Sequence, residues 1–323
     1  MSPENTMTPR QQFITALDRK GKPDRVPHFE LVFFLTMEAF GQVHPWHRNL
    51  YQWDQMSATE KDIHLRNIAE LYLKIAGKYE HDAIYLCRLR WGGDDELLRV
   101  VEIIREISGD KYCLMVEADG TMSVPDGGEM IEISCRMGEE PEKVLDEFSR
   151  RSDAEIERLQ GYCDHGGIDG VIMCSDYCFN TGPFLSPAWF DRFVTPFLVR
   201  ELTAYKQMGL YTIKHTDGNI MPILDSLLEG KPDGLHSLDP QGGIDMAEMV
   251  RVAGDRVTLC GNVSCAALQT GTDAECSESA RYALEHGKQA QGYIFCTSNC
   301  VYSGMELSRY DLIRDVWKTM RDY

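Results

Sequence analysis

Side chains that can bind a metal ion follow short apolar runs in the second half of the sequence. His215 and Asp217 follow one such run, Asp239 follows the next, and Cys260 and Cys300 follow the last two. Zinc accepts thiolate, imidazole and carboxylate ligands, and a catalytic zinc uses three protein ligands and keeps a fourth position open. These residue types predict a zinc site, with Asp239, Cys260 and Cys300 as the first choice of metal ligands.

Other groups compete for the role of the third ligand. His215 and Asp217 are either alternative ligands or partners that orient a ligand or the substrate. His236 and Asp233 are further alternatives, although Asp233 begins its apolar run and would point away from the others. Asp176, which follows an earlier run, is another candidate catalytic residue.

Each of these residues also has a simpler interpretation. A single thiol at the end of a strand is more often a small apolar core residue than a ligand. Residues 215–219 could form a turn in which Asn219 caps the next helix, and Asp176 could be a loop carboxylate that faces water. A zinc site with both thiols as ligands requires Cys260 and Cys300 to share one ion.

The elements that would position these side chains alternate along the chain. Short apolar runs rich in β-branched residues are each followed by a longer amphipathic stretch, which is typical of a parallel sheet with helical crossovers. No glycine-rich phosphate loop follows the first strand, so a closed barrel is favoured over an open doubly wound sheet. In such a barrel the active site lies at the carboxyl ends of the strands. The runs lie at residues 81–86, 170–174, 210–215, 233–238, 257–260 and 292–296.

The region from about residue 95 to 150 departs from this alternation. Short runs at 100–107, 112–116 and 130–134 are separated by Gly-Asp, Asp-Gly and Gly-Gly pairs, which are turn signals. They predict β-hairpins, as an insertion or an extension of the barrel rim. Because no linker or low-complexity tract divides the chain, residues 1–323 are predicted to form a single domain.

Composition argues against several classes of function. Asp and Glu number 51 against 33 Lys and Arg, and the formal net charge of −18 argues against nucleic acid and against an anionic membrane surface as partners. No apolar run approaches the ~18 residues that span a bilayer, and residues 1–10 lack the apolar core of a signal peptide. We therefore expect a cytoplasmic protein in which the eleven cysteines stay reduced. The sequence leaves the oligomeric state open and is compatible with a homodimer.

Several segments resemble the uroporphyrinogen decarboxylase superfamily. Lys22-Pro23-Asp24-Arg25-Val26-Pro27 is similar to the turn that follows its opening helix, and Gly182-Pro183-Phe184-Leu185-Ser186-Pro187 is similar to a later segment before a long helix. The resemblance extends over nearly the whole chain, is weakest between about 95 and 150, and implies a (β/α)8 TIM barrel. The segments in the second half that carry it are 215–219, 233–235, 254–257 and 261–263.

One branch of that superfamily decarboxylates porphyrinogens. Its members use an arginine pair in the loop after the first strand and a central aspartate. Here residues 29–41 contain no arginine, and Leu86-Cys87-Arg88 stands where the aspartate is expected. The resemblance therefore disfavours porphyrinogen decarboxylation.

The other branch consists of zinc methyltransferases that act with corrinoids. Members that use coenzyme M carry His-x-Cys and a later Cys, and this chain has His215, Asp217 and Cys300 in that order. The 39 residues between Cys260 and Cys300 resemble the Cys-x39-Cys pattern of aromatic O-demethylase methyltransferases. The resemblance implies an enzyme that demethylates an aryl methyl ether and transfers the methyl group to the cob(I)alamin of a separate corrinoid protein. Zinc would be its own metal, and Tyr302 would occupy the open zinc position in the empty enzyme.

Two other functions are compatible with the chain. One is a metal-free, decarboxylase-like lyase that acts on a small carboxylic acid, with Arg88, Arg90 or Lys214 supplying a cationic pocket. The other is a non-catalytic corrinoid- or tetrapyrrole-binding protein, although the Asp-x-His-x-x-Gly corrinoid motif is missing from the sequence. Zinc content separates both of them from the methyltransferase.

Overall fold

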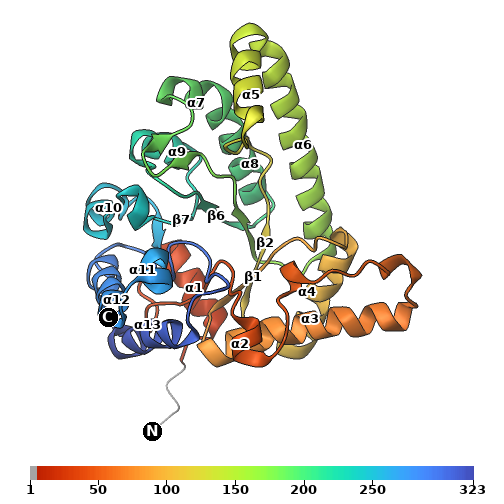
Figure 1. The fold of residues 1–323 in the computed structure, drawn as a ribbon, viewed down its shortest axis with the longest axis vertical. Coiled ribbons are helices and arrows are strands. Elements are labelled where there is room, and N and C mark those ends of the chain that lie inside the picture. The colour runs from red at the N-terminus through yellow and green to blue at the C-terminus, as the bar shows by residue number, and fades with distance from the viewer. Residues whose placement is uncertain (1–5) are drawn as a thin grey trace.

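The computed structural model describes residues 6–323 and centres on one parallel β-sheet. Its seven strands lie in the order β1-β2-β3-β6-β7-β8-β9, and the sheet is curled (Figure 1). Every neighbouring pair is parallel, so the carboxyl ends of the strands all lie at the same edge. The strands are β1 (Ala83–Leu86), β2 (Cys113–Glu117), β3 (Gly170–Met173), β6 (Tyr211–His215), β7 (Gly234–His236), β8 (Thr258–Cys260) and β9 (Tyr293–Ile294).

The six apolar runs predicted to be strands each contain a strand of this sheet, namely β1, β3, β6, β7, β8 and β9. This confirms the alternation of strands and helices. No helix within residues 6–323 is both long and apolar enough to cross a membrane. The helices are α1 (Pro9–Asp18), α2 (Thr36–Phe40), α3 (Ala58–Tyr79), α4 (Asp94–Ser108), α5 (Gly128–Glu139), α6 (Pro141–His165), α7 (Pro187–Phe193), α8 (Thr195–Gln207), α9 (Leu224–Glu229), α10 (Met246–Ala253), α11 (Cys265–Thr270), α12 (Asp273–Gly287) and α13 (Leu307–Met320).

An extended segment, residues 27–34, lies beside the last strand of the sheet. Isolated parallel bridges join His28 to Phe295 and Phe33 to Val301. On its other side, the carbonyl of His28 accepts a hydrogen bond from the backbone N–H of Asp82, next to β1 (2.7 Å). The segment thus contacts both edges of the seven-stranded sheet, while the complete eight-stranded barrel stays a prediction.

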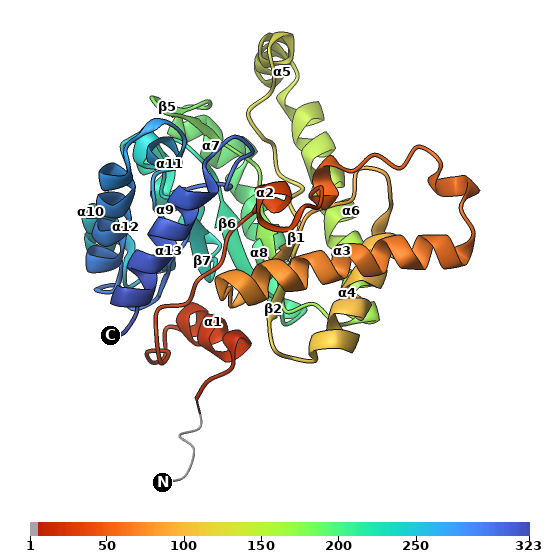
Figure 2. The same cartoon turned by 60° about the horizontal axis from the view of Figure 1, so that its bottom comes forward.

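The inside of the curled sheet is a packed apolar core that α1 closes at one end. Met115 and Ile172, on neighbouring strands, belong to one interior cluster with Leu17 of α1. The hydroxyl of Thr258, at the start of β8, donates a hydrogen bond to the carbonyl of Ala16 in the same helix (2.7 Å). Figure 2 shows α1 beneath the sheet. Because α1 covers the amino ends of the strands, a site open to substrate has to lie at their carboxyl ends.

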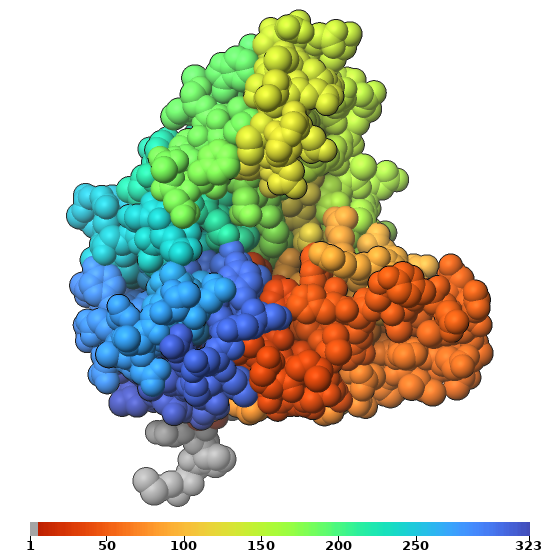
Figure 3. Space-filling model, viewed as in Figure 1, coloured from red at the N-terminus to blue at the C-terminus, as the bar shows by residue number. Residues whose placement is uncertain are grey.

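The prediction of β-hairpins between residues 95 and 150 is wrong. Residues 100–107 lie in α4 and residues 130–134 in α5, while residues 112–116 fall largely in β2, which pairs in parallel with β1 and β3. In α4, Leu97, Val101 and Ile104 are buried at helical spacing, and this period outweighs the β-branched composition. Helices α5 and α6 form a narrow lobe at the top of the molecule (Figure 3). The strands assigned as a hairpin among the described residues are β4 (Cys178–Phe179) and β5 (Gly182–Pro183).

Glu30 is a buried carboxyl group in the extended segment beside β9. Its Oε2 accepts hydrogen bonds from the backbone N–H (3.1 Å) and the hydroxyl (2.5 Å) of Thr297, whereas Oε1 has no hydrogen-bond partner within residues 6–323. Burial raises the pKa of Glu30 from 4.5 to about 8. The imidazole of His28, 3.6 Å away, supplies no compensating charge at neutral pH, because burial lowers its pKa to about 3.

We expect Glu30 to make stability fall as pH rises. Between pH 4.5 and about 8 the folded chain holds one proton more than the unfolded chain at this group, so the free energy of unfolding decreases by up to about 1.4 kcal/mol per pH unit. Above pH 8 this contribution is constant. Urea unfolding of the wild type and of Glu30→Gln from pH 5 to 9 measures the effect. Parallel pH profiles for the two proteins would contradict it.

Candidate metal centre

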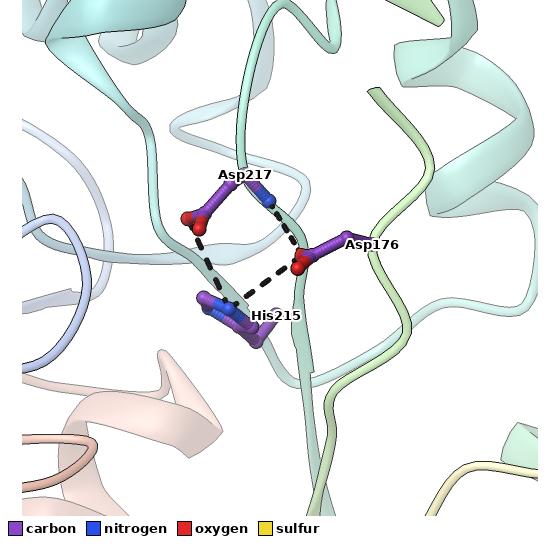
Figure 4. Close-up of side chains that lie close together, drawn as sticks. All are labelled: Asp176, His215 and Asp217. Atoms are coloured by element: carbon purple, nitrogen blue, oxygen red, sulfur yellow. Dashed lines mark hydrogen bonds and ion pairs between the residues drawn. The ribbon is translucent and has the colours of Figure 1, made fainter. Parts of the chain in front are cut away.

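Three potential ligands from two neighbouring strands meet at the carboxyl edge of the sheet (Figure 4). Asp176 follows β3, His215 ends β6, and Asp217 lies two residues further on. The Nε2 atom of His215 is 3.7 Å from Oδ1 of Asp176 and 3.9 Å from Oδ1 of Asp217. One ligand atom from each residue lies within 4.8 Å of the other two. These three side chains lie together because neighbouring parallel strands have their carboxyl ends at the same edge of the sheet.

A tight turn holds Asp217 in position. Its backbone N–H donates to Oδ1 of Asp176 (3.0 Å). Gly218 follows with a φ of +78°, and a Cβ there would stand 2.6 Å from the carbonyl oxygen of Phe179, so this position requires glycine. The side chain of Asn219 accepts from the backbone N–H of Met221 (3.2 Å). This hydrogen bond keeps the turn closed, but the residue that caps the following η3 (Met221–Ile223) is Ile220 and not the expected Asn219.

Hydrogen bonding fixes which nitrogen of His215 carries a proton. His236 Nε2 lies 3.2 Å from the carbonyl oxygen of Thr297, which can only accept, so this nitrogen is the donor. Burial lowers the pKa of His236 well below 6.5, so its ring is neutral and its Nδ1 is an acceptor. His215 Nδ1, 2.7 Å from that atom, must donate to it. Nε2 of His215 faces the two carboxylates, and in the neutral ring it offers a metal ion its lone pair.

The three facing atoms fit a divalent cation. Oδ1 of Asp217 is buried and has no hydrogen-bond partner among the described residues, and burial raises the pKa of Asp217 above its ordinary value. At metal–ligand distances of about 2.0–2.2 Å, two tetrahedral zinc ligands stand about 3.4 Å apart. The observed 3.7 and 3.9 Å are too long for hydrogen bonds but need only small shifts to surround an ion. A cation would satisfy all three lone pairs at once.

Asn299 supports the group from the loop after β9. Its side-chain amide donates to Oδ2 of Asp217, and its carbonyl Oδ1 accepts from the backbone N–H of Cys300 (2.7 Å). Oδ2 of Asp217 is therefore held from one side, while Oδ1 faces His215. Neither Asn299 nor the supporting role of His236 follows from the sequence pattern, because both depend on contacts across strands.

Of the first-choice ligands, Asp239 lies close to the three-residue group without belonging to it. Its carboxylate accepts from the backbone N–H of Gln241 (2.9 Å) and starts η4 (Pro240–Gly242). Burial is the main cause of a raised pKa at Asp239, and the backbone hydrogen bonds from Gln241 and Gly218 act in the opposite direction. The alternative Asp233 lies before β7, at the amino edge, where it accepts from the backbone N–H of Thr212 (2.8 Å).

Cys260 lies in the packed interior of the sheet. It is fully buried, and its thiol is directed to the carbonyl of Thr258 at 3.9 Å. A Cβ on Gly234 would stand 3.2 Å from this sulfur and 3.3 Å from Leu17 of α1. Since α1 closes the amino end of the sheet, the sulfur lies on the side away from the three-residue group, and burial raises the pKa of the thiol.

Cys300 and Tyr302 lie near the group. Burial raises the pKa of the Cys300 thiol well above its ordinary value, and the thiols of Cys87 and Cys265 and the carboxylate of Asp217 act in the same direction. Tyr302 is half-buried, and its pKa is raised by burial and then by its neighbour Cys300. The backbone N–H of Cys300 thus lies beside Asn299, whose amide contacts Asp217, but neither the Cys300 thiol nor the Cys260 thiol belongs to the three-residue group.

The chain is similar to known proteins in sequence and in fold. The family model described as Uroporphyrinogen decarboxylase (URO-D) matches residues 122–320. No curated protein matches the sequence. Among solved structures, a methyltransferase from Methanosarcina mazei is 18% identical with a TM-score of 0.73, over 97% of this chain and 99% of that chain. A GH5_18 from Bifidobacterium longum subsp. infantis is 12% identical with a TM-score of 0.46, over 93% and 80% of the two chains.

Proposed function

Because the chain belongs to the uroporphyrinogen decarboxylase family, whose model matches more than half of it, we propose that it is a methyltransferase built on that family's fold. In this proposal it requires zinc, demethylates an aryl methyl ether, and delivers the methyl group to the cob(I)alamin of a separate corrinoid protein. The observation that carries the proposal is the convergence of Nε2 of His215 on the carboxylates of Asp176 and Asp217, while its Nδ1 is held by His236. The fold similarity to a methyltransferase over almost the whole chain supports it.

Asp176, His215 and Asp217 are the proposed metal ligands and leave a fourth position open, with Cys300 proposed to support the site from beside it. This set differs from the first choice of Asp239, Cys260 and Cys300, because the sulfur of Cys260 is directed into the interior. Zinc accepts imidazole nitrogen and carboxylate oxygen donors of this kind. When bound there, zinc supplies a Lewis acid for the ether oxygen, whose leaving group is a phenolate.

The residues around the group have separable roles in this proposal. His236 accepts the Nδ1–H of His215 and so keeps Nε2 free for the metal. Asn299 holds Asp217 through Oδ2. Tyr302 borders the same neighbourhood and is proposed to contact the substrate or the open metal position. The extended segment 27–34 is proposed to complete a (β/α)8 barrel, with the corrinoid protein docking at its open end.

Two of the three cationic side chains that the lyase alternative would need, Arg88 and Lys214, form ion pairs within the protein. Arg88 is bound by both carboxylate oxygens of Glu155 (2.9 and 3.0 Å). Lys214 is fully buried and bound to Asp119 (2.7 Å). A free carboxylic acid substrate would therefore compete with existing partners at both positions, and no observation favours this function over the methyltransferase.

Metal analysis of two cysteine variants tests the ligand assignment. We expect Cys300→Ala to lower zinc affinity at least about tenfold, as the loss of a metal-supporting group does. The matched variant Cys260→Ala should keep the wild-type zinc affinity and lose only about 1 kcal/mol of stability through the small cavity. Zinc content after dialysis against a chelator series measures both. Loss of zinc from Cys260→Ala at unchanged fold would contradict the assignment.

Activity is tested separately with the zinc-loaded protein. Incubation with a panel of methoxyarenes and a reduced corrinoid protein should give the corresponding phenol and the methylated corrinoid in equal amounts. Phenol formation without zinc, or none with any donor in the panel, would contradict the proposed reaction.

A further inference from the structure

A short loop after β9, residues 297–299, contacts the candidate metal centre at two points. The carbonyl of Thr297 accepts the Nε2–H of His236 (3.2 Å), and Nδ1 of His236 holds His215. Two residues further on, the side-chain amide of Asn299 donates to Oδ2 of Asp217. The position of the 297–299 loop therefore affects the orientation of both His215 and Asp217.

The hydroxyl of Thr297 lies between two oxygen atoms that could each accept its proton. It is 2.5 Å from Oε2 of Glu30 and 2.8 Å from the backbone carbonyl oxygen of Asn299. Thr297 is fully buried. A hydroxyl has one proton to donate, and a carbonyl oxygen can only accept. Both contacts can be hydrogen bonds at the same time only if the carboxyl group of Glu30 carries a proton of its own.

The protonation state of Glu30 therefore decides how the loop is held. When Glu30 is protonated, Oε2 donates to the hydroxyl oxygen of Thr297, and that hydroxyl donates to the carbonyl of Asn299. Oε2 still accepts from the backbone N–H of Thr297 (3.1 Å) through a lone pair. When Glu30 is ionised, the hydroxyl donates to the carboxylate instead, and the carbonyl of Asn299 loses this donor.

The surroundings of Glu30 favour the protonated form. Its Oε1 is buried without a hydrogen-bond partner among residues 6–323, and burial raises its pKa to about 8. The titratable groups around it are neutral at pH 7, because burial lowers the pKa of each imidazole and raises the pKa of each phenol and thiol. These groups are His28, His44, Tyr72, His81, Tyr85, Cys265, Cys296 and Tyr310. No ion pair within the described chain joins Glu30 to an arginine or a lysine.

We propose that Glu30 is a positioning residue of the candidate metal centre, and that it acts in its protonated form by holding the 297–299 loop through the hydroxyl of Thr297. Glu30 does not belong to the three-residue group, and its effect reaches the group through His236 and Asn299. The inference deepens the proposed function and rests on its metal centre, but on neither the methyl donor nor the methyl acceptor.

Zinc affinity at pH 7 tests the link through the hydroxyl. Thr297→Val keeps the shape of the side chain without the hydroxyl and should lower zinc affinity about tenfold, whereas Thr297→Ser should bind zinc as the wild type does. Thr258→Val is the matched control, because this buried hydroxyl donates to Ala16 at the amino end of the sheet (2.7 Å). It should keep the wild-type affinity. Chelator competition measures all four proteins, and wild-type affinity in folded Thr297→Val would overturn the proposal.

Two substitutions of Glu30 separate its hydrogen bonding from its shape. Glu30→Gln keeps a donor and an acceptor without a charge and should bind zinc at pH 7 about as the wild type does. Glu30→Leu removes both groups and should lower zinc affinity about tenfold. Equal zinc affinity in the two folded variants would contradict a positioning role for the protonated carboxyl.

The protonation step is tested on the full-length, metal-free protein, where neither zinc nor the reaction enters. In a protein with isotope-labelled histidine, the NMR signal of the His236 Nε2–H reports its hydrogen bond to the carbonyl of Thr297. In the wild type this signal should shift between pH 7 and 9 with a midpoint near 8. Glu30→Gln should lack this shift, because its amide does not ionise. The same shift in Glu30→Gln would overturn the proposal.

Failure of this inference is distinguishable from failure of the proposed function. If zinc binds and methoxyarenes are demethylated while Thr297→Val and Glu30→Leu keep the wild-type affinity, the function stands and the positioning role is overturned. If the wild type binds no zinc, the proposed function fails, and the metal-free NMR profile still decides whether Glu30 controls the contact of His236.

Discussion

Replacing His215 with alanine is expected to abolish stoichiometric zinc binding and to lower the rate of methyl-ether cleavage about a thousandfold or more. His215 supplies the nitrogen donor of the candidate centre, whose Nε2 faces Asp176 and Asp217 at 3.7 and 3.9 Å. A Lewis acid at the leaving oxygen contributes several kcal/mol of transition-state stabilisation, and each ~1.4 kcal/mol corresponds to a factor of ten in rate. Zinc content and single-turnover rates, measured on the same preparations, check the result.

Variants of two other histidines are compared with His215→Ala. His165→Ala, at a partly exposed surface position, should leave zinc content and rate unchanged. His236→Phe removes the acceptor for Nδ1 of His215 and should lower zinc affinity about 10- to 100-fold, as expected for a residue that orients a ligand. Wild-type zinc content in folded His215→Ala would remove this residue from the centre.

Replacing Lys214 with methionine is expected to destabilise the fold by about 3–5 kcal/mol. Lys214 is fully buried beside the candidate centre, and its Nζ binds Asp119 (2.7 Å) and the carbonyl of Ser175 (2.9 Å). Burial alone would raise the pKa of Asp119, but the ammonium of Lys214 holds it below the ordinary value. Removal of the ammonium leaves a buried carboxylate without its counter-ion, which is costly.

The same substitution at an exposed lysine is the control. Lys206→Met removes an ion pair with Asp233 at a position that is one-third exposed and should cost less than about 1 kcal/mol. Urea unfolding of both variants gives the comparison. If Lys214→Met lost no more stability than Lys206→Met, the buried pair would contribute little to the fold.

The parts of the architecture that depend on the spacing of apolar residues along the sequence could be predicted. The run Gly170–Met173 and the later runs alternate with amphipathic stretches, and the strands lie where these runs indicated. The period also identifies α4, where Leu97, Val101 and Ile104 repeat at helical spacing, although the β-branched composition and the Gly-Asp pair suggested a hairpin. Here the helical repeat was the stronger physical signal.

Only part of the candidate site could be predicted. The order of residues does not show whether a side chain at the end of a strand faces the open edge of the curled sheet or its packed interior. Cys260 ends β8, yet its side chain belongs to the same interior cluster as Leu17 of α1, since the last residue of a strand can face the interior below the rim. The contact between His215 and His236 depends on the register of β6 against β7, which follows from packing across the whole sheet. Asp217 was identified as an alternative ligand and Asp176 as a catalytic candidate, and the structure adds their convergence on His215.

Zinc K-edge X-ray absorption of the metal-loaded wild type tests the central claim most directly. The account predicts one zinc per chain, bound by one imidazole nitrogen and carboxylate oxygens at about 2.0–2.2 Å, with at most one sulfur at about 2.3 Å. The His215→Ala variant should lose the imidazole signal together with the metal. Two sulfurs in the zinc shell, or a chain that takes up no zinc at all, would contradict the centre formed by Asp176, His215 and Asp217.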